Sequence, residues 1–153
     1  MSNLWAALLG TDKGSYPIEI EGQTVLVNAL DEQRFDRLAG KHPFGLTARD
    51  GDRLCEGGVV WTRLSGTRSL EQVRSFYRPP TVLFTKGAKG VALWAVRPHR
   101  NIWDANERLA RTFKGRIKDA DPWLFRLDIK GHKQEWRMDA YYHLDELVSR
   151  CAS

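Results

Sequence analysis

The chain has 153 residues, 42% hydrophobic and 28% charged, proportions that suit a folded globular domain and exclude a disordered or collagen-like chain. Charge is segregated along it: residues 60–133 carry a net +10, residues 1–59 carry −3 and residues 134–153 carry −2, within a total of +5. Clustered positive charge attracts the phosphates of nucleic acids, so this pattern favours a polyanionic partner over the alternative of a solvated arginine-rich surface.

Two further features restrict the class of protein. Cys55 and Cys151 lie far apart, with no second Cys or His at metal-ligand spacing, which indicates reduced thiols rather than a disulfide framework or a zinc site. The apolar run at residues 4–9 lacks a basic leader and is too brief for a signal peptide or a membrane span, so it predicts a packed first helix. We therefore expect a single cytoplasmic domain over residues 1–153, without a membrane partner. Its expected parts are an N-terminal hairpin, helix and loop region (1–58), a basic core (59–133) and a C-terminal strand and helix (134–153).

The N-terminal region predicts few regular elements. Apolar residues alternate on both sides of Gly22, over residues 18–21 and 24–28, which predicts a hairpin. Residues 31–38 predict a short helix that ends at Gly40 in a left-handed cap. Glycines and prolines break any periodicity from residue 41 to residue 58, so this stretch predicts a loop.

The basic core is more regular. Residues 59–64 are nearly continuously apolar and predict a central strand. Ser69 and Gln72 have the spacing of a capping box, which predicts the start of a helix that two prolines then end. Residues 81–85 and 91–96 predict two strands joined by a basic turn.

The remaining elements complete an α+β fold. Residues 104–114 predict a helix, residues 124–129 alternate cleanly as a strand would, and a turn at Gly131 leads to a further strand that includes Trp136. A last helix is expected over residues 144–150. This order predicts a mixed or antiparallel sheet with helices packed mainly on one face, which leaves the other face free for a ligand.

Candidate phosphate contacts lie in two glycine-bearing turns. The first, at residues 86–90, has glycines that let a backbone approach phosphate and two lysines that neutralise it, although its spacing is not that of a P-loop. The second turn, at Gly131, adjoins a strand face that also carries cations. Its candidate contacts are Arg126, Lys130, His132 and Lys133. Each turn is equally compatible with a plain solvated surface, and no nucleophile and base pair stands out among the four histidines.

Three segments carry a resemblance to a known family. Val60-Trp61-Thr62-Arg63-Leu64-Ser65-Gly66 is similar to a strand that bears an Asp-x-Asp pair before a glycine. Residues 79–94 are similar to a strand and a Ser-Gly-Gly-Gly-x-His type of turn that contacts a nucleotide. Residues 106–110 and 121–133 are similar to an Asn-x-x-Leu-Ala helix and the Asp-Pro segment after it. Together they resemble the archaeo-eukaryotic primase superfamily, the primase-polymerase domains of phages and plasmids, which implies a palm-like core related to an RRM.

The departures from that family concern its chemistry. The resemblance implies nucleotidyl transfer, for which paired carboxylates hold two metal ions. Here Arg63 and Ser65 take the register of the acidic pair, and that strand contains no carboxylate. Ala92 replaces the motif histidine, and Asp121 or Asp128 could supply only the third acid. The sequence therefore predicts a polymerase palm converted into a binding module.

We expect a non-catalytic primase-polymerase-like protein, without a metal site or cofactor, that acts in replication of a phage, plasmid or other mobile element. Its expected partners are single-stranded DNA or primer-template nucleic acid, together with a helicase or another replication protein. One alternative is a divergent metal-dependent primase or nucleotidyltransferase that uses Asp50, Asp52 and Glu56; another is a module that binds an acidic host or replication protein. The expected nucleic-acid contacts, all on one sheet face, are Arg63, Lys86, Lys89, Arg126, Lys130, His132 and Lys133.

Overall fold

The structure, a computed structural model, describes residues 5, 8, 9 and 14–152. Its strands are β1 (Tyr16–Ile20), β2 (Gln23–Val27), β3 (Arg49–Asp50), β4 (Arg53–Leu54), β5 (Gly57–Ser65), β6 (Val82–Lys86), β7 (Lys89–His99) and β8 (Lys133–Trp136). Its helices are α2 (Glu32–Ala39), α3 (Thr67–Arg74), α4 (Ile102–Phe113) and α5 (Leu144–Val148), with a 3-10 turn η1 (Ile117–Ala120). Among the described residues, no helix has the length and apolar character needed to cross a bilayer.

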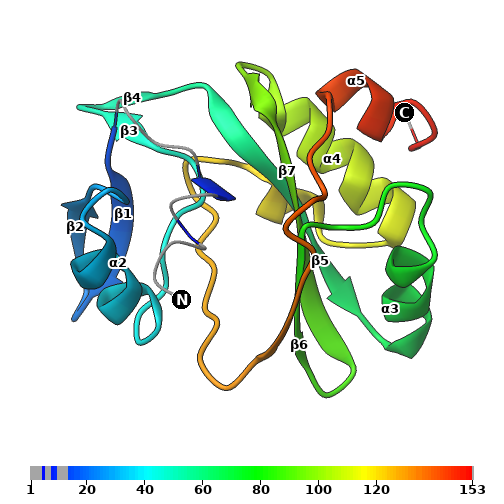
Figure 1. Ribbon diagram of the computed structural model, residues 1–153, viewed down its shortest axis with the longest axis horizontal. Coiled ribbons are helices and arrows are strands. Elements are labelled where there is room, and N and C mark those ends of the chain that lie inside the picture. The colour runs from blue at the N-terminus through cyan, green and yellow to red at the C-terminus, as the bar shows by residue number, and fades with distance from the viewer. Residues whose placement is uncertain (1–4, 6–7, 10–13, 153) are drawn as a thin grey trace.

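The elements form three layers (Figure 1). An antiparallel sheet in the order β5-β7-β6-β8 stands in the middle. Helices α3, α4 and α5 cover one face, and the β1–β2 hairpin with α2 lies on the other side. This is the α+β arrangement that the sequence predicts, with the helices of the basic core on one face of the sheet.

Strand register decides which side chains share a face. Trp61 pairs with Leu93, and Val60 pairs with Trp94. Because successive side chains of a strand point to opposite faces, the two pairs lie on opposite sides of the sheet. We call the side that carries Trp94 the helix face, because its ring stacks on Phe113 of α4 at a centroid distance of 6.0 Å, and the other side the inner face.

The inner face is not free, contrary to the prediction. The Trp5 ring stacks on Phe84 of β6 at 5.8 Å and meets Phe44 edge-on at 5.0 Å. The Trp61 ring stacks on Phe125 at 5.1 Å. The N-terminal region and the segment around Phe125 therefore bury the middle of this face. They remove the apolar surface of Trp61 and Phe84 from water. The end beside the β6–β7 turn stays exposed, at Ser65, Lys86 and Lys89.

The predicted central position of the strand at residues 59–64 is wrong. This strand is β5, and it lies at an edge of the sheet. Its apolar run is continuous because other elements cover that edge as well. Asn106 of α4, fully buried, accepts a hydrogen bond from the Trp61 amide at 2.8 Å and donates one to the Ala120 carbonyl at 3.1 Å. An edge strand whose backbone groups bond to a buried side chain can be as apolar as a central strand, so the two give the same sequence pattern.

Three local predictions are also wrong. Residues 124–129 form no strand; they make one bridge, Leu127 to Phe44, because the chain pairs with the 43–45 loop instead of the sheet. Ser69 does not cap α3, since its hydroxyl donates to the Phe113 carbonyl and the helix begins after Gly66. Gly40 ends α2 in a right-handed conformation, with φ −69°.

Candidate nucleic-acid interface

Three of the predicted contact residues meet at the open end of the inner face. In the sheet register Arg63 is opposite Val91, and Lys86 is opposite Lys89. Alternation from Val91 places Arg63, Lys86 and Lys89 on the same face. Both lysines are exposed, and the side chain of Arg63 is 41% exposed. We call the surface made by these three residues the hairpin-end surface.

Glycines shape the backbone of this surface. Gly87, at the tip of the β6–β7 turn, has φ +63°, and Gly66, which follows β5, has φ +99°. These left-handed conformations favour glycine and let the two turns close on each other. The Gly66 amide donates to the Ala88 carbonyl at 2.7 Å, so the end of β5 is fixed to the hairpin tip.

Arg63 is held by an acid that sequence reasoning missed. Its Nε lies 2.9 Å from Oδ2 of Asp119, a residue of η1, and its guanidinium carbon lies 5.6 Å from the centre of the Phe125 ring. The Asp119 carbonyl also accepts the indole N–H of Trp61 at 2.8 Å, which fixes η1 against the sheet. The ion pair offsets the charge of Arg63, so Lys86 and Lys89 supply the uncompensated charge of the hairpin-end surface.

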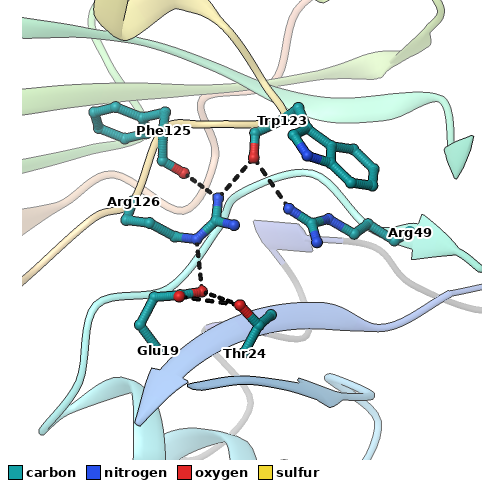
Figure 2. Close-up of polar contacts among 6 residues, drawn as sticks. All are labelled: Glu19, Thr24, Arg49, Trp123, Phe125 and Arg126. Carbon is teal, nitrogen blue, oxygen red and sulfur yellow. Dashed lines mark hydrogen bonds and ion pairs between the residues drawn. The ribbon is translucent and has the colours of Figure 1, made fainter. Parts of the chain in front are cut away.

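Arg126 does not join this group. Figure 2 shows its guanidinium turned toward the N-terminal hairpin, where Nε lies 3.1 Å from the Glu19 carboxylate. Its Nη1 donates to the carbonyls of Trp123 and Phe125, both at 2.9 Å. The prediction of one shared face is therefore wrong for Arg126. Its side chain, 19% exposed, joins the 123–126 segment to β1.

A second arginine shares that contact. Arg49 donates to the Trp123 carbonyl at 3.0 Å, and its guanidinium carbon lies 3.7 Å from the centre of the Trp123 ring (Figure 2). Burial, and then the neighbouring charge of Arg126, lower the pKa of Arg49, while Glu19 acts against that shift. The carboxylate of Glu19 also accepts the Thr24 hydroxyl at 3.0 Å. These hydrogen bonds hold the 123–126 segment against the N-terminal region, so the two arginines have a structural role.

The other three predicted contacts lie beside the hairpin-end surface. Lys130 and His132 flank the Gly131 turn, and Nζ of Lys86 lies 3.5 Å from the point that a Cβ on Gly131 would occupy. The Lys130 amide is bound by the Asp128 carboxylate at 3.0 Å, which shapes the turn. Lys133 pairs with Thr85 and so lies on the helix face, around the corner from the others.

Acids are sparse where a two-metal site would need them. Arg63 and Ser65 lie on one face at the end of β5, where the resemblance places the Asp-x-Asp pair. Val91 is the residue opposite Arg63, whereas Ala92 lies on the helix face, and neither is a histidine. Across residues 5, 8, 9 and 14–152, no three His, Cys, Asp or Glu side chains gather closely enough to hold a metal ion.

The remaining candidate acids lie elsewhere. Asp50 and Asp52 belong to the β3–β4 hairpin, which Figure 1 shows at the opposite end of the molecule from the β6–β7 turn. The Asp121 carboxylate accepts a hydrogen bond from the Trp123 amide, two residues along the chain, at 2.9 Å. Neither set extends the hairpin-end surface.

Comparison with solved structures identifies the architecture. The primase-polymerase domain of cyanophage S-2L superposes with a TM-score of 0.65 at 10% identity, over 95% of this chain and 94% of that one. The catalytic domain of the primase RepB′ in complex with initiator DNA gives 0.60 at 14% identity, over 97% of this chain and 90% of that one. A second RepB′ primase structure gives 0.64 at 12% identity, over 97% and 60%. This chain has the primase-polymerase fold.

The two sequence comparisons find no relative. No protein-family model matches the chain, and no curated protein matches it significantly. The solved structures nevertheless confirm the fold that the resemblance over residues 59–133 implies, and the likeness of fold covers nearly the whole chain. At these identities the likeness concerns architecture, so activity has to be argued from the side chains.

Proposed function

We propose that this protein is a non-catalytic primase-polymerase-like module that binds single-stranded DNA or a primer-template junction during replication of a phage, plasmid or other mobile element. A helicase or another replication protein would be a further partner. The proposal rests on one observation: at the end of β5, where the resemblance places an acidic pair, the fold presents Arg63 beside two exposed lysines, Lys86 and Lys89.

The chemistry of these groups suits phosphate. Arg63 brings a guanidinium, not a metal ligand, to this end of β5, and Asp119 offsets its charge, so the attraction for an anion comes mainly from the two lysines. Lys86 and Lys89 are flexible point charges on an exposed turn, which neutralise phosphates without reading bases. The backbone of Gly87 and Ala88 lies open between them. The RepB′ catalytic domain was solved with initiator DNA, which makes a nucleic acid the natural ligand to test on this fold.

Fluorescence anisotropy with a labelled oligo(dT) at two salt concentrations tests the proposal. We expect a dissociation constant in roughly the micromolar range at low salt, with little dependence on base sequence. The variant Lys86→Gln/Lys89→Gln should bind about tenfold more weakly, and the slope of log affinity against log salt should fall by about 1.4. A matched control is Arg34→Gln/Lys41→Gln, which removes the same charge from exposed positions of the N-terminal region. Equal losses in the two double variants would contradict a site at the hairpin end.

An enzymatic function has its own test. Primer synthesis or nucleotide incorporation with Mg²⁺ or Mn²⁺, lost in Asp50→Ala/Asp52→Ala, would contradict the non-catalytic part of the proposal. The exposed β3–β4 position of these acids, far from the hairpin-end surface in Figure 1, supports the expectation that incorporation stays at background.

A further inference from the structure

A channel lies between α3 and the helix face of β6 and β8. It consists of two hollows with volumes of about 570 and about 380 Å³. Arg74 of α3 and Glu135 of β8 line both hollows, so the two hollows lie next to each other with this ion pair between them. The larger hollow ends at the tip of the β6–β7 hairpin, and the smaller one ends at Pro79 and Pro80.

The walls of this channel are basic. Lys86 and Lys133 line the larger hollow, Arg137 lines the smaller one, and Arg74 lines both. Glu135 is the one acid among the lining residues, and its carboxylate lies 2.9 Å from Nη2 of Arg74. This ion pair is about half exposed on each side, and exposed pairs of this kind are weak, so a phosphate can compete for Arg74.

The floor of the channel is apolar. Leu70 of α3 and Leu83 of β6 are buried there, and the rings of Pro79 and Pro80 form the far end. An apolar floor between cationic walls matches a single strand, whose phosphates seek charge while its sugars and bases bury apolar surface.

Lys86 connects the channel with the hairpin-end surface. Its register places it on the inner face beside Lys89, yet it also lines the larger hollow, next to Gly131. A strand that leaves the inner face at Lys86 therefore meets Lys133 on the helix face without crossing an acidic region. We propose that this channel is a second phosphate-binding track, which takes the continuation of a single-stranded nucleic acid held at the hairpin-end surface. The inference rests on the proposed function and extends it.

The test compares oligonucleotide lengths. Labelled oligo(dT) of about 6 and about 18 nucleotides would be titrated against the full chain, since short strands fill one site and longer strands reach a second. The channel variant is Lys133→Gln/Arg137→Gln, which leaves Arg63, Lys86 and Lys89 intact. Its matched control is again Arg34→Gln/Lys41→Gln. Circular dichroism and melting temperature establish that each variant is folded.

For the wild type we expect the longer strand to bind at least about tenfold more tightly than the shorter one. The channel variant should bind the short strand within twofold of wild type, lose most of the gain with length, and lose about 1.4 from the salt slope for the long strand. The control variant should keep the gain. A gain with length that survives in the channel variant overturns the inference while the proposed function stands.

Two other outcomes also decide the matter. If the wild type binds neither length at low salt, the proposed function fails and the channel inference fails with it. If a poly-glutamate peptide binds in a way that Lys133→Gln/Arg137→Gln abolishes, while long-strand binding is untouched, the channel belongs to an acidic protein partner and the nucleic-acid track is refuted.

Discussion

Replacing Arg126 by Met separates a structural role from a nucleic-acid contact. The side chain is 19% exposed, and it makes three hydrogen bonds, one to Glu19 and two to carbonyls. Met fills a similar volume but donates none of them. Hydrogen bonds that involve a charged group contribute about 1.5–3 kcal/mol each when buried, and partial hydration of Glu19 recovers some of that loss. We therefore expect the free energy of unfolding to fall by about 2–3 kcal/mol, or about 4–12 °C in melting temperature for a chain of this size.

The assay is thermal and urea denaturation of Arg126→Met beside Arg34→Met, a control at an exposed position of α2 that should change the melting temperature by less than about 2 °C. Oligo(dT) affinity, corrected for the folded fraction, should match wild type in both variants. A double-mutant cycle with Glu19→Gln should give a coupling energy of about 1 kcal/mol. The reasoning is refuted if Arg126→Met melts like wild type but binds oligo(dT) much more weakly.

Three further perturbations test the rest of the structure. Trp5→Ala should lower the free energy of unfolding by about 3–5 kcal/mol in urea denaturation, because the ring packs against Phe84 and Trp136 of the sheet and against Phe44; a loss below 1 kcal/mol would mean that Trp5 packs only loosely on the sheet. Asn106→Ala should lower it by about 2–3 kcal/mol, since it leaves the Trp61 amide without an acceptor, and an unchanged urea midpoint would contradict that role. Burial raises the pKa of the Cys151 and Cys55 thiols, so both should alkylate slowly at neutral pH and faster as pH rises, with the more buried Cys151 the slower. Mass spectrometry of the alkylated peptides measures this, and faster labelling of Cys151 would be inconsistent with the structure.

The sequence predicts single helices and hairpins better than it predicts which elements pack against one another. The hairpin around Gly22 and the helix predicted over residues 104–114, which is α4 in the structure, follow from periodicity and turn chemistry, which act within a few residues. The position of β5 at the sheet edge depends on Asn106, which lies 45 residues away in the chain. A long-range partner of this kind leaves no trace in a local pattern, so a covered edge strand and a central strand look alike.

The same limit applies to the candidate site. The sequence predicts that Lys86 and Lys89 share a face, and the structure shows it, because both belong to a single hairpin, whose register a tight turn fixes. Arg126 alternates with apolar residues as a surface strand residue would, but its partner Glu19 comes from a different part of the chain. Asp119 was missed for the same reason, since its pairing with Arg63 joins η1 to a strand far away in the sequence.

The Arg63–Asp119 pair links the fold to the proposed chemistry. A two-metal centre needs several carboxylates with free oxygens at one place, and their mutual repulsion is offset only by the bound cations. At the end of β5 the Asp119 carboxylate already has a counter-charge, Arg63, at 2.9 Å, and two more cations, Lys86 and Lys89, stand on the same face. A divalent ion there would have to displace Arg63 and approach two ammonium groups, whereas a phosphate would meet attraction from both lysines. The same cations that disfavour metal binding at this end of the palm thus favour a nucleic-acid backbone.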